Sequence, residues 1–463
     1  MADITTVVGA SGQTFVVTVS GGQTQLLAQQ YQTAVSTLHA SGGLDSYDLV
    51  PGSNGATGTT TGQGLISQGG DYTVSGGTTQ YIAAGIAAGS YSTTGEDTLN
   101  SAVSLDVSGS TAQSISILTG DWAGVTLTVG NQDGLFIGGV GNNTFKGGNS
   151  TGNWTIATGD GDDTITGTNG NDTISGGLGQ NLITLGSGTN VVRSEGQDTI
   201  DGTTGTDTVT LLGGSSVVTL GANATVYDTT SHNTVSGGNN SFITGGSSST
   251  YFSTGAVSTV SGGLNDTISA SADIWQIRGT ANSITASGAL TFLNGTGATT
   301  VSAGTSTLFG ASGLDLILVD GSASSTNLFV GGDGSETVSA ASSNGTLHAF
   351  AGTGDETIIG GSAADTLVGG SGAATLTGGS GAANLFALTK GSAGGDYTIT
   401  DFGSAAGNLM ALYQYGLQNN DGLASVLANA TIAGGNTTIE LSDNSKITFV
   451  GVTDLNASDF TLS

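Results

Sequence analysis

The residues of this chain that could do chemistry lie in a short repeat between Thr158 and Thr210. The repeat reads TGDGDDTIT (158–166), GTNGNDTIS (167–175), GGLGQNLIT (176–184) and LGSGTNVVR (185–193), then the shorter SEGQDTID (194–201) and GTTGTDTVT (202–210). Glycines mark the second and fourth positions, Asp or Asn the sixth, and an aliphatic residue the eighth. Carboxylates beside the bare carbonyls of glycine are the oxygen ligands that calcium prefers. The repeat therefore predicts calcium sites.

The same spacing predicts which elements position these sites. Glycine allows a tight turn with positive φ, and the last three residues of each repeat form a short strand whose middle side chain points inward. Two repeats make one coil, so a residue lies above its counterpart about 18 positions later. We therefore expect Asp163 near Asn181 and Asp172 near Asn190, with calcium between the stacked loops. A flexible linker is the other interpretation of Gly/Ser/Thr-rich sequence, but a linker does not place an aliphatic residue at every ninth position.

This pattern resembles that of the RTX (repeats-in-toxin) proteins, GGxGxDx(aliphatic)x. The resemblance implies a parallel β-roll with calcium between its coils, and export by type I secretion. Weaker repeats follow the same pattern elsewhere: GGVGNNTFK (138–146), GASGLDLIL (310–318), GGDGSETVS (331–339), AGTGDETII (351–359), GGSAADTLV (360–368), GGSGAATLT (369–377) and GGSGAANLF (378–386). Position six fades to alanine in the last two, so these coils are expected to lack full calcium sites.

The candidate calcium ligands are the glycines and the position-six residues of these repeats. They are Gly159, Gly161, Asp163, Gly170, Asp172, Gly177, Gly179, Asn181, Gly188, Asn190, Asp198, Gly205, Asp207, Asp315, Gly332, Gly334, Glu336, Gly354, Glu356 and Asp365.

Composition narrows the class of protein. The 463 residues include 83 glycines, no cysteine, and 34 acidic against 5 basic residues, which gives a formal net charge of −29. This charge argues against binding to nucleic acid, which needs basic surfaces, and against unaided binding to anionic lipid. It also opposes compaction unless cations neutralise it. Without cysteine there are no disulfides and no thiol chemistry.

We expect an all-β fold: a parallel β-solenoid or β-roll with calcium between coils, a small N-terminal helix and a C-terminal β capping module. The expected segments are an N-terminal cap or assembly segment (1–59) with one helix over 24–40, an irregular β-solenoid (60–157), the RTX-type roll with degenerate solenoid (158–386) and a C-terminal cap (387–463). Within the cap, strands are expected at 397–402, 437–442 and 446–451, and a short helix near 422–428.

The two ends of the chain bear on its export. The N-terminus lacks the basic start and apolar stretch of a signal peptide, and no run of 18 apolar residues predicts a membrane span. The final residues, DNSKITFVGVTDLNASDFTLS (443–463), resemble the uncleaved C-terminal signals of type I secretion substrates. We therefore expect an extracellular or cell-surface location on a Gram-negative bacterium, with the type I secretion machinery as a partner.

No catalytic motif accompanies the repeats. The three histidines (His39, His232 and His348) have no neighbouring ligand pattern, and neither an HExxH zinc motif nor a GxSxG nucleophile elbow occurs. The three tryptophans (Trp122, Trp154 and Trp275) could form sugar-stacking platforms, although filling of solenoid corners is the simpler interpretation. The sequence therefore does not predict an enzyme.

The leading hypothesis is a secreted structural protein that self-assembles, in a calcium-dependent manner, into a surface layer, filament or biofilm matrix. Its expected partners are other copies of itself and cell-surface polysaccharide, without nucleic acid or membrane insertion. The alternative is a monomeric adhesin or carbohydrate-binding protein. A polysaccharide-active enzyme is a third hypothesis, for which the residues offer no cleft.

Overall fold

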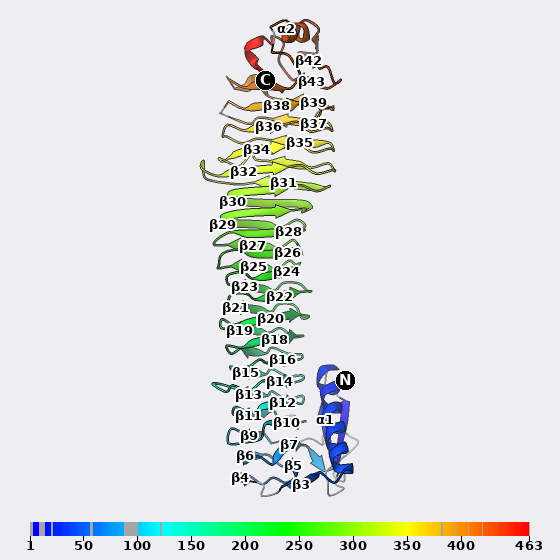
Figure 1. Ribbon diagram of the computed structural model, residues 1–463, viewed down its shortest axis with the longest axis vertical. Helices are drawn as coiled ribbons and strands as arrows, with labels where there is room; N and C mark the ends of the chain where they lie inside the picture. Colours follow the sequence, from blue (N-terminus) through cyan, green and yellow to red (C-terminus); the bar gives the residue numbers. More distant parts are fainter. Residues whose placement is uncertain are drawn as a thin grey trace. The chain divides into compact units, whose positions relative to one another are not determined.

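The computed structural model describes residues 3–8, 14–19, 22–55, 59–87, 101–120, 123–380, 383–392, 394–405, 407–418 and 420–462, so Trp122 lies outside the described residues. The chain divides into two compact units, Met1–Ser241 (unit 1) and Phe242–Ser463 (unit 2). In each unit, short parallel strands stack as successive coils (Figure 1). This confirms the expected all-β parallel solenoid with two short helices.

Unit 1 begins with a small antiparallel sheet and an α-helix, α1. Strands β1 (Asp3–Val8), β2 (Thr14–Val19) and β8 (Ile86–Ala87) form the sheet, and α1 spans Gly22–Ala40. The expected helix over 24–40 is thus present, and it begins slightly earlier, at Gly22.

The coils of unit 1 build two strand faces, one of which lies under α1. This helix-side face contains β3 (Leu44–Asp48), β5 (Thr61–Ile66), β7 (Thr79–Ala84), β10 (Ser114–Thr119), β12 (Asp133–Ile137), β14 (Trp154–Ala157), β16 (Thr173–Ser175), β18 (Thr189–Ser194), β20 (Thr206–Leu211) and β22 (Thr225–Asp228). The opposite face contains β4 (Gly52–Gly55), β6 (Gly70–Ser75), β9 (Val103–Asp106), β11 (Val125–Thr128), β13 (Thr144–Lys146), β15 (Thr164–Thr166), β17 (Leu182–Thr184), β19 (Thr199–Gly202), β21 (Val217–Leu220) and β23 (Thr234–Gly237). Parallel pairing begins at β3, ahead of residue 60.

The register between coils follows the nine-residue repeat. Thr164 pairs with Leu182, and Thr155 pairs with Thr173, with the same offset of 18 residues that separates Asp163 from Asn181. The middle residue of each strand points inward, and these residues form an aliphatic core at most 1% exposed: Ile165, Ile174, Ile183, Val192, Ile200 and Val209. Each such buried side chain contributes roughly 1.5–3 kcal/mol. The repeat therefore forms the core through its eighth position.

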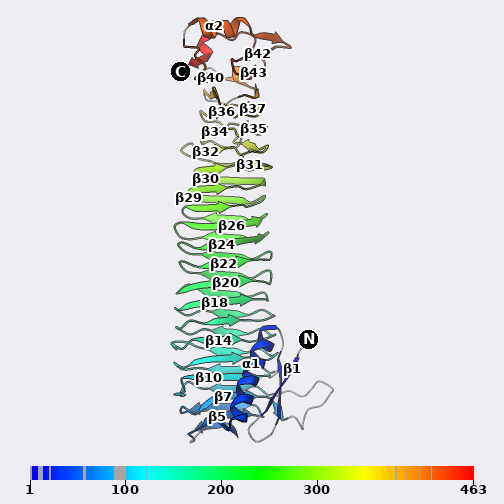
Figure 2. The ribbon, with the colours of Figure 1, turned by 45° about the vertical axis from the view of Figure 1, so that its right-hand side comes forward.

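Helix α1 lies along the helix-side face of unit 1 (Figures 1 and 2). Its buried residues Leu27, Ala28, Tyr31 and Val35 pack over one outward-facing column of that face. In this column the covered residues are apolar and at most 2% exposed: Leu65, Ala83, Leu118, Ile137 and Ala157. Further along the same column Ser175, Arg193 and Thr210 follow. The apolar part of the column thus coincides with the part that the helix covers.

Unit 2 also has two strand faces, which we name after an exposed aromatic residue on each. The Trp275 face contains β24 (Phe242–Ser247), β26 (Ser258–Leu264), β28 (Ile274–Ile277), the second halves of β29 (Ser283–Leu293) and β30 (Gly297–Phe309), β32 (Thr326–Val330), β34 (Thr346–Phe350), β36 (Thr366–Val368), β38 (Leu385–Thr389), β40 (Leu409–Tyr413) and β44 (Phe460–Leu462). The Phe252 face contains β25 (Thr250–Ser253), β27 (Thr267–Ala270), the first halves of β29 and β30, β31 (Leu314–Leu318), β33 (Thr337–Ser339), β35 (Glu356–Ile359), β37 (Ala374–Thr377), β39 (Asp396–Ile399) and β43 (Lys446–Phe449).

The C-terminal part of unit 2 closes its last coils. Helix α2 (Asn420–Ala428) precedes β41 (Thr431–Ala433) and β42 (Asn436–Glu440), and β42 pairs antiparallel with β43. Phe386, Phe402, Phe449 and Phe460 form a continuous aromatic cluster here, with centroid distances between 4.9 and 6.2 Å. The short helix and a strand at each expected place are present, but each strand ends two or three residues before the expected end, and Phe402 lies in a 3-10 helix (Phe402–Ser404). Within the described residues, no helix has the length and apolar character needed to cross a membrane.

Two tryptophans lie within the described residues, and they differ. Trp154 is 1% exposed and packs against Phe145, with ring centroids 5.2 Å apart, as the corner-filling interpretation expects. Trp275 is 44% exposed, so that interpretation is wrong for this residue. Its neighbours Ile274 and Gln276 take the inward positions of β28, which leaves the indole on the outer surface.

Candidate metal centre

The position-six side chains of unit 1 form hydrogen-bonded ladders along the coils. In the first ladder, the backbone N–H of Asn143 donates to Oδ1 of Asp163 (2.6 Å), and that of Asp163 donates to Oδ1 of Asn181 (2.9 Å). The N–H of Asn181 then donates to Oδ1 of Asp198 (3.1 Å). The expected neighbours Asp163 and Asn181 are therefore in direct contact, and each carboxylate is separated from the next by a neutral amide.

A second ladder runs beside the helix-side strands. Here the N–H of Trp154 donates to Oδ1 of Asp172 (2.9 Å), and the N–H of Asp172 donates to Oδ1 of Asn190 (3.1 Å). The side-chain amide of Asn190 donates to Oδ1 of Asp207 (2.8 Å). The contact predicted between Asp172 and Asn190 is thus present.

The glycines of the repeat bring backbone carbonyls next to these ladders. A side chain at Gly177 would collide with the carbonyl oxygen of Gly159 in the preceding coil. Gly188 has the same close contact with the carbonyl of Gly170 without a positive φ, so here close approach rather than turn conformation requires glycine. Equivalent contacts join Gly161 to Gly179, Gly179 to Gly196 and Gly188 to Gly205. The corners of the roll are therefore lined by stacked, bare carbonyls.

Three of the ladder carboxylates of unit 1 have a buried oxygen without a hydrogen-bond partner. These atoms are Oδ2 of Asp163, Oδ2 of Asp198 and Oδ2 of Asp207, in residues that are at most 2% exposed. Burial raises the pKa of Asp163 to about 6 and that of Asp207 to about 6, and it raises the pKa of Asp198. A buried carboxylate of this kind is destabilising until a cation or a proton neutralises it.

Asp172 differs from these three because both of its oxygens accept hydrogen bonds. Beyond the bond from Trp154 to Oδ1, Oδ2 accepts from the N–H of Thr168 (2.7 Å), and the Thr168 hydroxyl contacts both oxygens at 3.0 and 3.2 Å. Thr168 stands where the pattern has its second-position glycine. That departure was the available sequence signal for a carboxylate satisfied by its own loop.

These donors fit calcium. Among the described residues, no three His, Cys, Asp or Glu side chains converge, so a cation here would be held by peptide carbonyls with single carboxylates, the set that calcium accepts. The residues that would hold it are Asp163, Asp198 and Asp207 together with the carbonyl-bearing glycines of adjacent coils. Bound calcium would supply the positive charge that the buried carboxylates lack.

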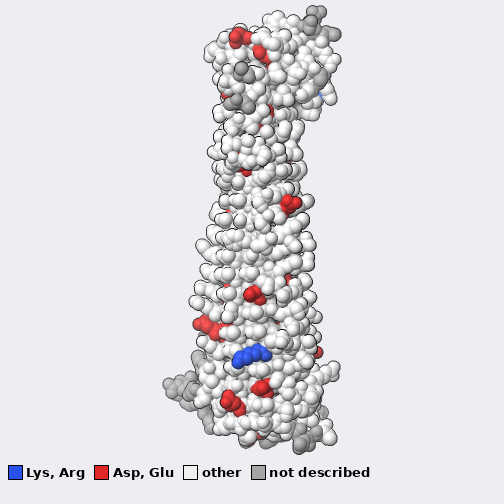
Figure 3. Space-filling view, turned by 90° about the vertical axis from the view of Figure 1, so that its left-hand side faces the viewer, with Lys and Arg blue, Asp and Glu red and all other residues white. Residues whose placement is uncertain are grey.

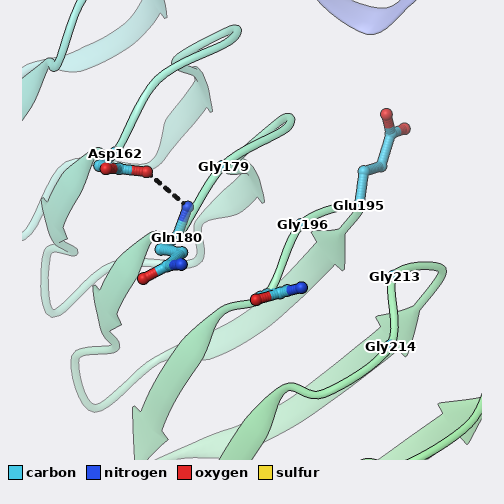
Figure 4. A pocket seen from close by; sticks show the side chains of 8 residues that line it. Asp162, Gly179, Gln180, Glu195, Gly196, Gly213 and Gly214 are labelled. Atoms are coloured by element: carbon cyan, nitrogen blue, oxygen red, sulfur yellow. Dashed lines mark hydrogen bonds between the residues drawn. The ribbon is translucent and has the colours of Figure 1, made fainter.

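A shallow groove of about 450 Å³ lies outside the glycine corner of unit 1 (Figure 4). Oδ1 of Asp162 accepts a hydrogen bond from the N–H of Gln180 (2.8 Å) at its rim. Glu195 extends away from Asp162 and is paired with Arg193 (2.6 Å). The groove therefore offers one exposed carboxylate and backbone groups, which suits an accessory ion contact rather than catalysis.

In unit 2, the candidate ligands separate into different environments. Glu336 and Glu356 precede the paired residues Thr337 and Thr357, so they lie in successive coils. Neither oxygen of buried Glu356 has a hydrogen-bond partner, and burial together with the charge of Glu336 raises its pKa to about 7. Stacked glycine carbonyls accompany the pair, including those of Gly332, Gly334 and Gly354. These residues repeat the arrangement of unit 1, with glutamate in place of aspartate.

Two other carboxylates of unit 2 do not share that arrangement. Oδ1 of Asp365 accepts from the N–H of Leu347 and Oδ2 from the N–H of Gly361, both at 2.7 Å, so it is satisfied like Asp172. Asp315 is exposed and pairs with Thr337, while Leu314 takes the buried position that aligns with Glu336 of the next coil. The expected placement of Asp315 at position six is therefore wrong, because the inward residues of β31 are Leu314 and Leu316, one position out of phase with the repeat pattern.

The ladders also contain residues that were not among the candidates. They share one signal, an Asn, Asp or Ser two positions before an inward aliphatic or aromatic residue, and they include Asn143, Ser216, Asn233, Asp266, Asn282, Asn384 and Asn408. Most carry no charge, so these ladders continue by hydrogen bonding alone.

A model of a known protein family matches part of this chain. The family model described as RTX calcium-binding nonapeptide repeat (4 copies) matches residues 158–192, 194–218 and 350–384. No curated protein and no solved structure matches the chain. The matched segments contain the orphaned oxygens of Asp163, Asp198, Asp207 and Glu356. With these calcium-binding motifs built into a parallel solenoid, the chain carries RTX repeats and fits an RTX β-roll protein.

Proposed function

We propose that this chain is a secreted, calcium-dependent structural protein that self-assembles into an extracellular surface layer, filament or biofilm matrix. The observation that carries the proposal is the set of buried carboxylates that no positive charge among the described residues neutralises. The other residues of these coils serve only to build the solenoid. RTX repeats occur in secreted proteins of Gram-negative bacteria, which supports an extracellular or cell-surface location and export by type I secretion. The partners in this proposal are further copies of the chain and, secondarily, cell-surface polysaccharide.

Charge connects the fold to assembly. A formal net charge of −29 makes copies of the chain repel one another until cations neutralise part of it. On the side of the molecule shown in Figure 3, acidic residues stand apart from one another among uncharged ones. Folding of residues 158–210 and approach of the subunits therefore both depend on calcium. The concentrations needed are roughly 10⁻⁴–10⁻³ M, which are typical of extracellular calcium modules.

The test is to purify the chain in chelator, add millimolar calcium and follow the mass by light scattering, with negative-stain imaging of the product. We expect ordered polymers that dissolve when the chelator returns. A folded monomer at all concentrations with calcium would contradict self-assembly by this chain.

Exposed aromatic residues favour a second candidate, a monomeric adhesin or carbohydrate-binding protein. Trp275 is 44% exposed and Phe350 is 43% exposed, both on the Trp275 face. Aromatic rings of this kind can stack on sugar rings. Binding of monomer to a glycan array, without assembly in the light-scattering experiment, would support this candidate.

A further inference from the structure

The Trp275 face of unit 2 carries an outward-facing apolar column over six successive coils. Backbone pairing aligns its members in order: Ile277, Leu293, Phe309, Val330, Phe350 and Val368. All are at least partly exposed, with Phe309 at 38% and Phe350 at 43%. Six consecutive coils with an apolar residue at the same outward position form a continuous hydrophobic strip.

The neighbouring columns of this face are almost free of charge. The next column contains Trp275, Thr291, Thr307, Leu328, His348 and Thr366, and a third contains Ala289, Thr305, Thr326 and Thr346. His348 is the one ionisable residue in the three columns. Asp365, next to Thr366, is buried, and the nearest exposed acidic residues are Asp273, two positions before Trp275, and Asp333 and Asp355, which follow the strands. In a chain of formal charge −29, such a neutral area is where a second copy can approach with least repulsion.

Unit 1 shows what the chain does with an apolar outward column. There, Leu65, Ala83, Leu118, Ile137 and Ala157 are covered by α1 and excluded from water. The column of unit 2 has larger residues and no such cover among the described residues, since its side chains stay exposed. Its exposure therefore points to a cover supplied from outside the chain.

We propose that the Trp275 face is a contact surface between two copies of this chain; the inference rests on the proposed self-assembly and assigns it a surface. The contact is face to face and symmetric, with the Phe309 and Phe350 rings of each copy packed against the aliphatic residues of the other. Four of the six strip residues are aliphatic and offer no hydrogen-bonding group. The strip therefore suits a protein surface better than a sugar.

The size of the face sets the strength of the contact. Three columns about 7 Å apart, over six coils about 4.8 Å apart, give a flat area on the order of 500 Å² per copy. Two copies then bury about 1,000 Å², near the lower limit of specific protein–protein interfaces. A single contact of this size is weak and, being symmetric, closes into a pair, so stable association requires a second contact that joins such pairs into an array.

The test uses the full chain with calcium and compares charged substitutions on the two faces. Phe309→Glu with Phe350→Glu places two carboxylates in the strip, and Phe252→Glu with Ile317→Glu is the matched control, since these residues are 41% and 36% exposed on the other face of the same unit. Sedimentation velocity should show that the double variant needs at least a tenfold higher concentration to assemble, while the control assembles like the unmodified chain. Circular dichroism should be unchanged in both variants, because each replaced side chain lies on the outer surface and none belongs to the fully buried core.

A cross-linking variant makes the result independent of the charge. The chain has no cysteine, so Thr307→Cys on the Trp275 face should give disulfide-linked dimers on oxidation, whereas Thr285→Cys on the Phe252 face should not. Normal assembly of the Glu double variant, or equal cross-linking from both cysteines, would overturn the assigned surface and leave self-assembly standing. An unmodified chain that stays monomeric would refute both, and loss of glycan binding in the double variant would assign the strip to carbohydrate.

Discussion

The coils of residues 158–210 and those of residues 242–293 have the same core but different corners. Both place one aliphatic or aromatic residue per strand inside, such as Ile183 and Ile268, each at most 1% exposed. In 158–210 successive ladder residues are 17 or 18 residues apart, and the corners are stacked glycine carbonyls. In 242–293 the same spacing shortens to 16 or 17 residues.

The shorter coils turn differently. Their corners use residues other than glycine in the left-handed region: Ser248, Val257, Asn265, Arg278 and Ala281. The ladder continues through Ser249, Asp266 and Asn282, with one carboxylate in three positions. The difference indicates that the glycine corners of residues 158–210 provide carbonyls suited to a cation, while the core does not require such corners.

The largest expected effect is common to both regions and establishes what they share. Ile183→Ala and Ile268→Ala each delete a buried side chain and leave a cavity, so each should lower the free energy of unfolding by about 2–5 kcal/mol. Denaturant unfolding with saturating calcium measures both. A cost below about 1 kcal/mol at either site would contradict a shared, close-packed core.

The next largest effect is the pH dependence of stability in the absence of calcium, which distinguishes residues 158–210 from residues 242–293. Because the pKa of Asp163 is raised to about 6 from an ordinary value of 3.8, the folded state binds more protons than the unfolded state between these values. The stability of the 158–210 coils is therefore full below about pH 4 and falls, on the order of 2 kcal/mol, as the pH rises through 6. The free energy of local unfolding of these coils, measured in chelator at pH 4 and at pH 7, gives the size of this loss.

Calcium should reverse that sign. Its binding needs the deprotonated carboxylate and weakens as the pH falls below about 6. The same stability profile with and without calcium would count against these carboxylates as the ligands.

A smaller effect, on the calcium concentration needed for folding, distinguishes two carboxylates within residues 158–210. Asp163→Asn removes a buried charge with an orphaned oxygen, so it should raise the calcium concentration at half-folding roughly tenfold, about 1.4 kcal/mol, while stabilising the chain in chelator. Asp172→Asn is the control: it disturbs the bonds from Thr168 and lowers stability with or without calcium. Equal shifts of the calcium midpoint in both variants would contradict the distinction.

The smallest effect concerns the turns of the shorter coils. Val257 has φ 51°, where a β-branched residue is strained. Val257→Gly should therefore stabilise unit 2 by about 0.5–1 kcal/mol after the entropy cost of glycine. Asn265→Gly is the matched control and should be near neutral, because Asn tolerates its φ of 56°. Thermal unfolding of the two variants measures the difference, and destabilisation by Val257→Gly would show that its contacts outweigh the strain.

Much of the structure of residues 158–210 is predictable from the sequence, because a single nine-residue period determines it. The 18-residue offset predicted the contacts of Asp163 with Asn181 and of Asp172 with Asn190, and the inward position of the eighth residue. These features depend on the local repeat alone. Helix α1 and the C-terminal strands were predictable for a similar reason, from hydrophobic spacing within each segment.

The remainder depends on contacts between coils that no local pattern reveals. Leu314 and Leu316 take the inward positions of β31, so Asp315 is exposed although its repeat matches the pattern. Ile274 and Gln276 take the inward positions beside Trp275. The apolar strip of unit 2 likewise arises only when six strands are aligned in register.

Hydrogen–deuterium exchange of the full chain, in chelator and in millimolar calcium, tests most directly whether calcium acts through the glycine corners. We expect calcium to slow amide exchange at least about tenfold in residues 158–210. In residues 242–293 the change should stay below about twofold, because hydrogen-bonded ladders and tight turns hold those coils. Equal protection of both regions, or none in 158–210, would contradict a local role for the orphaned carboxylates.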